Sequence, residues 1–210
     1  MKKYSVKEIF LTLQGEGFNT GKTAIFCRFT GCNLWNGKSK GKEKAICNFC
    51  DTDFIGTNGI NGGKYLLNEL VNKVEALWPT KKDKKFIVFT GGEPLLQLDS
   101  ALVNILKKNN FFVAIETNGT ICPPDNIDWI CVSPKVKSKL KVKNGNEIKI
   151  VYPQENIKIK EYEKLNFKHY YIQPLDNKNY LVNKTKAIDF VIKNPNWKLS
   201  LQTHKYIGIK

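Results

Sequence analysis

The sequence lacks any apolar segment that approaches the run of about eighteen residues needed for a membrane-spanning helix. Its first residues, MKKYSVKEIF, turn polar after two lysines and contain neither the apolar stretch nor the small-residue cleavage site of a signal peptide. These absences predict a cytoplasmic protein with no membrane partner. Thiols stay reduced in that compartment, so clustered cysteines there are more often metal ligands than disulfides.

Arginine is almost missing as well: all but one of the 34 basic residues are lysine, and Arg28 is the exception. The formal net charge is still +15, which favours anionic partners such as nucleic acid or acidic substrates. Proteins that read nucleic-acid sequence rely on arginine and interleaved aromatic residues, whereas these lysines are scattered. We therefore expect no direct nucleic-acid partner and interpret most lysines as a solvated surface.

Histidine is equally scarce, since only His169 and His204 are present. A structural zinc ion takes four nitrogen or sulfur ligands, and no second C-x-x-C pair accompanies Cys47 and Cys50. A zinc site would have to recruit His204 or Cys122 from a distant part of the chain. The composition therefore leaves zinc open but gives it few ligands.

Three cysteines do gather in CNLWNGKSKGKEKAICNFC, residues 32–50. Fourteen residues separate Cys32 from Cys47, and two separate Cys47 from Cys50. A 4Fe–4S cubane usually takes four cysteines, so three would leave one iron open to a small molecule with an amine and a carboxylate. The remaining cysteines are interpreted as core or surface thiols: Cys27, Cys122 and Cys131.

Apolar, β-branched runs alternate with segments of helical spacing. The predicted strands are 6–13, 24–29, 86–89, 111–115, 129–132, 148–152, 170–172 and 199–201, and the predicted helices are 65–78, 98–108 and 184–193. This alternation indicates βαβ units and a mainly parallel sheet. A complete (β/α)₈ barrel needs about 250 residues, so we expect an α/β fold with a partial, open barrel in a single domain, residues 1–210.

Polar clusters directly follow five of the predicted strands. They are TGGEP at 90–94, ETNGT at 116–120, SPK at 133–135, QPLD at 173–176 and QTHK at 202–205. The carboxyl ends of parallel strands share one edge of a sheet, and active-site loops converge there. We therefore expect the functional site at this edge.

The motifs taken together resemble a known family. CNLW…CNFCDTDF followed by TGGEP is similar to the radical S-adenosylmethionine superfamily. FLTLQGEG (10–17), FCRFTGC (26–32), ETNG, SPK and QTHK narrow the resemblance to its 7-carboxy-7-deazaguanine synthases, over residues 6 to 207. The first cysteine gap is longer than the usual C-x3-C-x2-C spacing, as in a subgroup of these synthases, and residues 33–46 are interpreted as an insertion in the cluster loop.

The resemblance implies a barrel of the radical S-adenosylmethionine type and a lyase. The reaction would convert 6-carboxy-5,6,7,8-tetrahydropterin to 7-carboxy-7-deazaguanine with loss of ammonia, in 7-deazapurine (queuosine-type) biosynthesis. A radical derived from S-adenosylmethionine would take a hydrogen from the pterin, and the ring would contract. Implied cofactors are one 4Fe–4S cluster per chain, S-adenosylmethionine and magnesium; implied partners are an electron donor such as a flavodoxin and a second copy of the chain.

The same resemblance assigns roles to residues in the matching motifs. Cys32, Cys47 and Cys50 would bind the cluster and Thr52 magnesium. The S-adenosylmethionine site would comprise Phe49, Asp51, Gly92, Glu93, Ser133, Lys135, Gln173 and Leu175, and the glycines at 91–92 would let the backbone approach the cofactor. The substrate site would comprise Leu13, Gln14, Gly15, Glu16, Arg28, Thr90, Glu116 and His204. No acid or base is assigned, and Glu116 is the one candidate.

Several of these residues have a structural interpretation as well. Arg28 has a planar fork suited to the substrate carboxylate, but an ion pair would also hold it. Glu93 could lie in the first turn of a helix, QGEG could form a simple turn, and His204 could be a core histidine. The sequence ends in YIGIK, whereas members of the family end in proline, so no role is carried over to Lys210.

Two other functions fit part of the pattern. An activase of glycyl-radical enzymes also carries GGEP and a three-cysteine loop, but it lacks the combination of LQGEG, ETNG and QTHK. A basic RNA-binding module with a zinc knuckle would explain the charge and the cysteines. It would not explain five polar clusters at one edge of a sheet.

Overall fold

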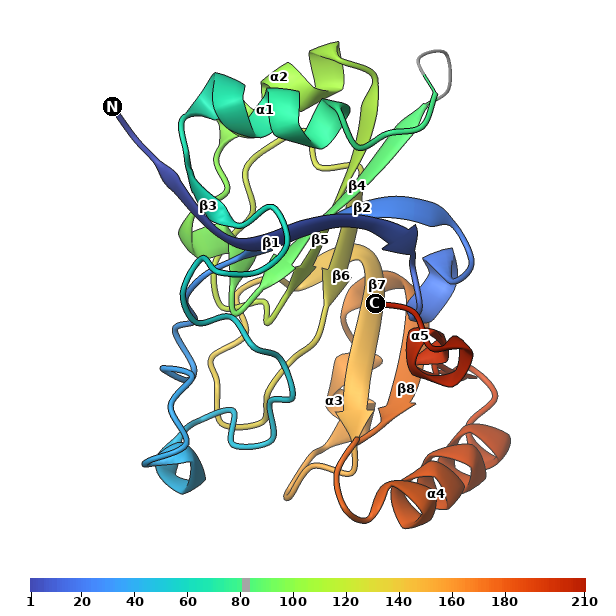
Figure 1. The fold of residues 1–210 in the computed structure, drawn as a ribbon. Helices are drawn as coiled ribbons and strands as arrows, with labels where there is room; N and C mark the ends of the chain where they lie inside the picture. Colours follow the sequence, from blue (N-terminus) through green and yellow to red (C-terminus); the bar gives the residue numbers. More distant parts are fainter. Residues whose placement is uncertain (81–83) are drawn as a thin grey trace.

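The computed structural model describes residues 1–80 and 84–210, and within them nine strands form one sheet in the order β3-β1-β2-β4-β5-β6-β7-β8-β9 (Figure 1). β1 is antiparallel to β2 and β3, and the pairs from β2–β4 to β8–β9 are parallel. The predicted α/β fold with an open, mainly parallel sheet is confirmed. The strands are β1 (Tyr4–Leu13), β2 (Thr23–Phe29), β3 (Gly63–Tyr65), β4 (Lys85–Gly91), β5 (Phe111–Thr117), β6 (Trp129–Val132), β7 (Asn144–Tyr152), β8 (Asn166–Pro174) and β9 (Lys198–Leu199).

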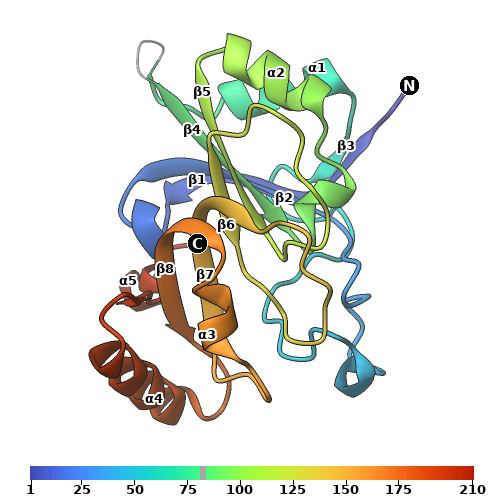
Figure 2. The ribbon, with the colours of Figure 1, turned by 180° about the vertical axis from the view of Figure 1, so that it is seen from behind.

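The helices cover the sheet in two groups, as Figures 1 and 2 show from opposite sides. One group, α1 (Leu67–Glu75) and α2 (Ser100–Lys108), packs against β1, β2, β4 and β5. The other, α3 (Ile159–Tyr162) and α4 (Tyr180–Lys193), packs against β7 and β8. A short α5 (Thr203–Ile207) lies near the chain end. The 3₁₀ turns in the described residues are Gly17–Asn19, Lys42–Lys44 and Pro94–Leu96.

Alternation along the strands decides which residues face the helices, because successive side chains of a strand point to opposite faces. The helix-facing positions are apolar and buried, as for Phe89 in β4 and Ile148 in β7. The following residue in each of these two strands is polar, Thr90 and Lys149 respectively. The parallel strands thus carry a buried apolar face under the helices and polar side chains on the opposite, inner face near their carboxyl ends.

Element boundaries differ from the predictions where the pattern is short. β3, α3 and α5 were not predicted, because three to five residues carry too little periodicity. The helix expected at 65–78 begins at Leu67, since Tyr65 pairs with Tyr4 as part of β3. α4 begins at Tyr180, earlier than expected. One sheet joins strands from both ends of the chain.

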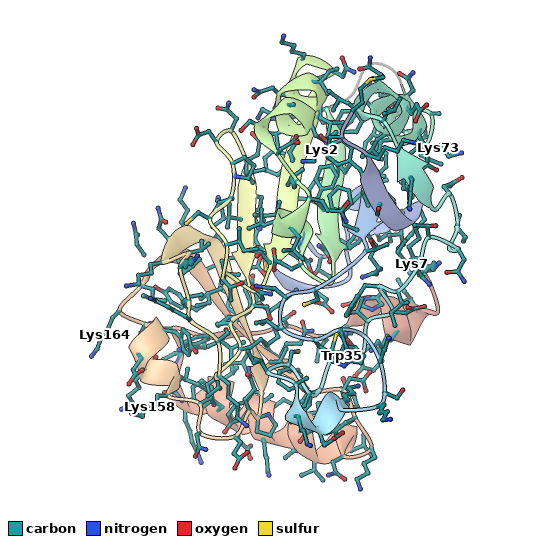
Figure 3. The ribbon with its side chains drawn as sticks, turned by 90° about the vertical axis from the view of Figure 1, so that its left-hand side faces the viewer. Lys2, Lys7, Trp35, Lys73, Lys158 and Lys164 are labelled. Atoms are coloured by element: carbon teal, nitrogen blue, oxygen red, sulfur yellow. The ribbon has the colours of Figure 1, made fainter. Side chains whose placement is uncertain are left out.

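The lysines are spread over the surface. Figure 3 shows Lys73 and Lys158 on different sides of the molecule, and Lys2 far from Lys164. This agrees with the interpretation of the lysines as a scattered, solvated surface. Within residues 1–80 and 84–210, no helix combines the length and the apolar character required to cross a bilayer.

Candidate active site

A cavity of about 580 Å³ opens on the inner face of the sheet, at the carboxyl edge of its parallel strands. Small-molecule sites typically have volumes of about 300–1,000 Å³, so the cavity suits a cofactor together with a substrate. Polar side chains reach it from neighbouring strands: Arg28 of β2, Thr90 of β4, Glu116 of β5, Lys149 of β7 and Gln173 of β8. The edge predicted from the five polar clusters is where the cavity lies.

The predicted site residues meet in this cavity, with one exception. Glu93 does not line it. The lining includes the three cluster cysteines, the predicted magnesium ligand and the other predicted cofactor and substrate residues, namely Cys32, Cys47, Cys50, Thr52, Phe49, Asp51, Gly92, Ser133, Lys135, Gln173, Leu175, Leu13, Gln14, Gly15, Glu16, Arg28, Thr90, Glu116 and His204.

The three cysteines share one end of the cavity. A hydrogen bond from the Cys47 thiol lowers the pKa of Cys50, and burial opposes that shift. Cys32 accepts a hydrogen bond from the Leu34 backbone N–H at 3.4 Å. In the described residues, no three His, Cys, Asp or Glu side chains converge on one metal ion. The donor set of three thiols around a cavity end fits a cluster that binds each thiolate through a different iron.

A cation lies beside these sulfurs. The Lys135 ammonium donates to the Ser133 backbone oxygen and hydroxyl, both at 2.8 Å, and lies 5.8 Å from the centre of the Phe49 ring. Burial lowers the pKa of Lys135, and the neighbouring Cys47 and Cys50 oppose that shift. No carboxylate of the described residues forms an ion pair with Lys135. The site therefore presents a cation that can hold an anionic group of a ligand.

The glycine pair after β4 brings the TGGEP turn against the cysteine loop. A Cβ atom on Gly92 would lie 2.1 Å from the Gly31 carbonyl oxygen and 2.7 Å from the Cys32 Cβ. The Glu93 backbone N–H donates to the same Gly31 oxygen at 2.9 Å. The sequence suggested that these glycines admit a cofactor. In the structure, Gly92 lines the cavity and also lets the backbone that carries Cys32 pack closely.

Glu93 lies behind the cavity wall, and its side chain is fully buried at 0% exposure. Its carboxylate accepts hydrogen bonds from the Leu95 N–H at 3.0 Å, the Thr117 hydroxyl at 2.8 Å and the Asn118 N–H at 2.8 Å. Burial raises the pKa of Glu93, and these donors oppose that shift. Glu93 thus caps the 3₁₀ turn Pro94–Leu96, close to the predicted place in the first turn of a helix, and its carboxylate also joins that turn to the ETNG turn. The geometry gives no support to a direct contact with the cofactor.

Side-chain hydrogen bonds also hold the ETNG turn against the loop that carries Cys32. The Asn118 side chain donates to the Asn33 side chain at 2.9 Å, and Asn33 donates to the Thr120 hydroxyl at 2.7 Å. Glu93 binds the Asn118 N–H, and the Asn118 side chain binds Asn33, which directly follows Cys32. Hydrogen bonds therefore connect Glu93 to the residue next to Cys32.

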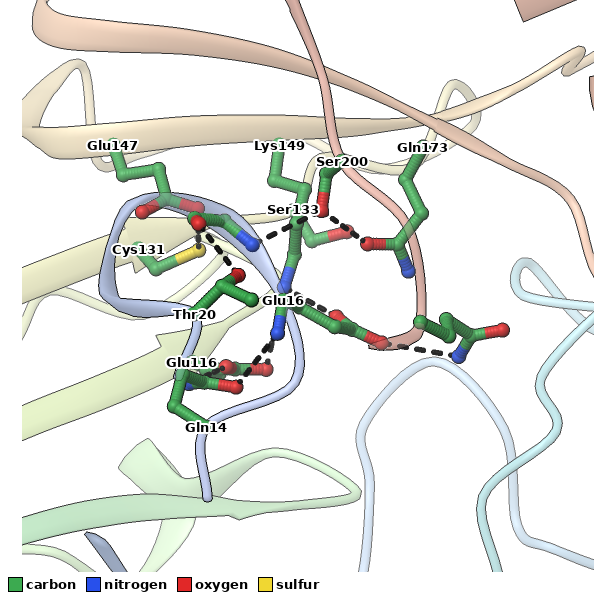
Figure 4. A network of polar contacts seen from close by, with 12 residues as sticks. Gln14, Glu16, Thr20, Glu116, Cys131, Ser133, Glu147, Lys149, Gln173 and Ser200 are labelled. Carbon is green, nitrogen blue, oxygen red and sulfur yellow. Dashed lines mark hydrogen bonds and ion pairs between the residues drawn. The ribbon is translucent and has the colours of Figure 1, made fainter. Parts of the chain in front are cut away.

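A polar network lines the other end of the cavity, as Figure 4 shows. The buried Lys149 ammonium lies 2.5 Å from Glu16 Oε2 and 3.6 Å from Glu116 Oε2. Although burial alone would raise the pKa of Glu16, the charge and hydrogen bond of Lys149 lower it to about 2. Gln14 donates to Glu116 Oε1 at 2.9 Å and Gln202 to Glu16 Oε1 at 3.0 Å. Glu16, a predicted substrate residue, is therefore held as a carboxylate.

Lys149 was missed by the motif argument, although the strand pattern contains a signal. In NEIKIVY, Glu147 and Lys149 occupy alternate positions opposite Ile148 and Ile150. Two charged residues on one face of a strand whose other face is core indicate a polar interior face. The buried Cys131 contacts Glu147 on this face, at 3.5 Å, while Cys27 belongs to the core and Cys122 is exposed.

Arg28 forms the ion pair considered for it and also lines the cavity. Its Nε donates to Glu8 Oε1 at 3.0 Å, and its guanidinium lines the cavity. Glu8 also pairs with the Lys210 ammonium, and the Thr12 hydroxyl donates to the Lys210 backbone oxygen at 2.6 Å. Both Glu8 and Lys210 line the cavity, so the last residue contributes to its wall.

His204 packs against Gly15, whose missing side chain leaves room for the imidazole at the cavity wall. A Cβ atom on Gly15 would lie 2.2 Å from His204 Nδ1, and the Thr203 N–H donates to the Gly15 oxygen at 2.9 Å. His204 is half-buried at the cavity wall, which argues against a core histidine. Lys205 pairs with Asp51 at 3.0 Å and with Asp176, and this joins α5 to the segment after Cys50.

Comparison with known proteins gives this geometry a family. The model of the radical SAM superfamily matches residues 44–131. A 7-carboxy-7-deazaguanine synthase of Burkholderia multivorans is 51% identical over 207 residues, which cover 98% of this chain and 99% of the relative. A synthase of the same name from Bradyrhizobium diazoefficiens is 49% identical over 208 residues, with 99% of each chain covered.

A solved structure agrees with these relatives. The crystal structure of QueE from Escherichia coli matches with a TM-score of 0.72 and 27% identity, and covers 96% of this chain and 95% of that chain. Full-length similarity to named synthases favours neither an activase of glycyl-radical enzymes nor an RNA-binding zinc module. The chain therefore belongs to the 7-carboxy-7-deazaguanine synthase family of the radical SAM superfamily.

Proposed function

We propose that the cavity holds S-adenosylmethionine at its cysteine end and a pterin at the end lined by Glu16, Glu116 and Arg28. As a member of its family, the chain converts 6-carboxy-5,6,7,8-tetrahydropterin to 7-carboxy-7-deazaguanine with loss of ammonia, and it uses a 4Fe–4S cluster and S-adenosylmethionine. The observation that carries the site assignment is that the cluster cysteines and the proposed substrate residues line the same cavity of about 580 Å³.

At the cysteine end, Cys32, Cys47 and Cys50 would hold the cluster. When bound, the cluster and S-adenosylmethionine supply the electron and the carbon radical that start the reaction. Lys135 and Ser133 offer a cation and a hydroxyl to the methionine carboxylate and the ribose. The remaining residues of the proposed cofactor site form its walls: Phe49, Asp51, Gly92, Gln173 and Leu175.

At the other end, the chain offers groups that complement a carboxylated pterin. Arg28 pairs with Glu8 through its Nε. Its two Nη groups are therefore suited to donate a pair of hydrogen bonds to the substrate carboxylate. Glu16 and Glu116 offer oxygens to the N–H donors of the pyrimidine edge. Thr90 and His204 add polar contacts, and Leu13, Gln14 and Gly15 form the adjoining wall.

Magnesium is part of this proposal. Thr52 lines the cavity and lies two residues after Cys50 in the sequence. Magnesium prefers hard oxygen ligands and keeps several waters, so one threonine hydroxyl together with substrate oxygens can hold it. We expect magnesium to bind with the substrate.

We also propose that the chain works as a homodimer in the cytoplasm, with a reduced flavodoxin or similar donor. Exposed apolar side chains on α4 and α5 support a second copy: Leu181, Val182, Ile192, Tyr206 and Ile207. Sedimentation velocity checks this, because a monomer has a mass of 24.0 kDa and a dimer twice that. Sedimentation as a monomer at micromolar concentration would contradict the proposal.

The reaction itself is tested with oxygen-free protein. We expect reconstituted protein to be brown, to contain about four irons per chain, and to form 7-carboxy-7-deazaguanine from the tetrahydropterin, S-adenosylmethionine and a reductant. Mass spectrometry identifies the product. Cleavage of S-adenosylmethionine with no deazaguanine acid would reject the substrate assignment while leaving the cofactor assignment intact.

Removal of the Thr52 hydroxyl tests the magnesium site. We expect Thr52→Ala to lower kcat/KM about tenfold, since one ligand to the ion is lost, and to abolish the response of the rate to added magnesium. Thr185→Ala, an exposed threonine on α4, is the control and should keep both. A full magnesium response in Thr52→Ala would exclude this role for Thr52.

A further inference from the structure

We propose that Lys149 is a positioning residue for the substrate: its buried ammonium keeps the Glu16 and Glu116 carboxylates together, so that both accept N–H donors from one edge of a pterin. The inference rests on the proposed function, which supplies the pterin. Neither the sequence motifs nor the family resemblance marked Lys149. The geometry of the inner face of the sheet points to it.

The three side chains form one unit on the cavity wall. Lys149 is 3% exposed, and its ammonium lies 2.5 Å from Glu16 Oε2 and 3.6 Å from Glu116 Oε2. Glu16 follows β1, Glu116 ends β5 and Lys149 lies in β7, so three distant segments meet here (Figure 4). All three residues line the cavity. Lys149 is therefore the bridge that brings two acceptor groups from different segments to the same place.

The second oxygen of each carboxylate is fixed as well. Glu16 Oε1 accepts from the Gln202 side chain at 3.0 Å, and Glu116 Oε1 accepts from the Gln14 side chain at 2.9 Å. A carboxylate oxygen has two lone pairs, so each oxygen keeps acceptor capacity for a ligand. Both carboxylates are thus oriented before the substrate arrives, which lowers the cost of binding.

Other charged and titratable groups also face the Lys149 ammonium, besides Glu16 and Glu116. It faces Glu16 from the loop after β1, Glu116 from β5, the Cys131 thiol from β6 and Glu147 from its own strand, while Lys135 and His204 are further cationic or titratable groups near the network. Glu147 accepts from the Phe18 N–H at 3.1 Å. Burial raises the pKa of Glu147, whereas Lys149 holds the pKa of Glu16 low. Glu147 is therefore protonated more easily than Glu16.

Loss of the ammonium would change what the cavity offers. Two carboxylates that share a buried site without a cation cannot both ionise, so one of them takes a proton near neutral pH. The protonated carboxyl presents an O–H donor where the pterin also presents a donor. Binding of the pterin should then weaken at low pH and recover as pH rises, because rising pH removes that proton.

Calorimetric titration of the reconstituted holoenzyme tests this directly. The protein is loaded with S-adenosylmethionine, without reductant, and titrated with 6-carboxypterin, an oxidised analogue that does not react. Measurements run between about pH 6 and pH 7.5, where imidazole and a carboxyl with a raised pKa titrate but ordinary carboxylates do not. Lys149→Met removes the charge at similar volume, and Lys149→Arg keeps it. Lys168→Met removes an exposed lysine from β8 and is the matched control.

We expect wild-type protein and Lys168→Met to bind with an affinity that hardly changes with pH. Lys149→Met should bind at least about tenfold more weakly at the low end of the range, and the loss should shrink as pH rises. Lys149→Arg should bind within about fivefold of wild type. Equal weakening of Lys149→Met at every pH, or unchanged binding, would overturn the inference.

Two further outcomes are decisive. If wild-type protein does not bind 6-carboxypterin, the substrate assignment fails and the inference fails with it; if wild type binds, only the variants bear on Lys149. If Lys149→Met does not fold, the double variant Lys149→Met with Glu16→Gln replaces it, because it removes one carboxylate together with the ammonium. Its binding should be weaker and independent of pH, and a pH-dependent affinity would contradict the proposal.

Discussion

Gly92→Ala should yield a protein that folds but retains about a tenth or less of the wild-type iron, because overpacking of this kind shifts the backbone. The added Cβ atom would lie 2.1 Å from the Gly31 carbonyl oxygen and 2.7 Å from the Cys32 Cβ. Neither neighbour is the end of a flexible side chain, so the loop that carries Cys32 has to move. Iron analysis after anaerobic reconstitution, with circular dichroism for folding, measures the effect. Activity should fall with the iron content.

Gly41→Ala is the control for this experiment. Gly41 lies in the cluster loop with a positive φ of 83°, and a Cβ atom there would meet nothing within 4 Å. It therefore introduces backbone strain of about 1–2 kcal/mol in the same loop without the collision. Full iron in Gly41→Ala and lost iron in Gly92→Ala would assign the effect to the contact. Full iron in both would show that the turn after β4 does not position Cys32.

Glu93→Ala should lower the free energy of unfolding by about 3 kcal/mol, because three donors lose a buried, charge-assisted acceptor. For a chain of this size the Tm should fall by roughly 6–12 °C. Glu93→Gln should lower it by only about 1–2 kcal/mol. The amide can keep an oxygen at the Oε1 position, toward Leu95 and Thr117, but then opposes the Asn118 N–H with a donor. Denaturant unfolding of the three proteins measures the series.

The Glu93 series also separates the two roles considered for this residue. If Glu93 bonds directly to the amine of S-adenosylmethionine, its loss should raise the KM for that cofactor and leave stability unchanged. If it joins the turns at Leu95 and Asn118, stability and iron content should fall together, since Asn118 holds Asn33 beside Cys32. The buried geometry leads us to expect the second result.

The fold was predictable because the strands carry an uninterrupted apolar face. Runs such as 24–29 and 111–115 lie within observed strands, and the polar residues that follow them mark the edge that holds the cavity. The antiparallel β3 was not predictable, since GKY has no pattern of its own and is a strand only because β1 lies beside it. Short elements depend on tertiary partners that a local window does not contain.

The site was predictable where chemistry requires a residue type at a fixed spacing. Cys47 and Cys50 are such a case, and so are the residues of SPK. Glu93 and Lys149 show where prediction of the site from the sequence fails. The motif that contains Glu93 marks the residue but does not tell that its side chain is buried and does not line the cavity. Lys149 has no motif at all, and its importance arises from carboxylates that lie far away in the sequence.

The ion pair between Lys205 and Asp51 decides how firmly α5 is held against the segment after Cys50. The two side chains are 43% and 45% exposed, and such contacts contribute at most about 1 kcal/mol, so thermal motion breaks and remakes them readily. The contact that joins α5 to the segment directly after Cys50 can therefore open and close readily.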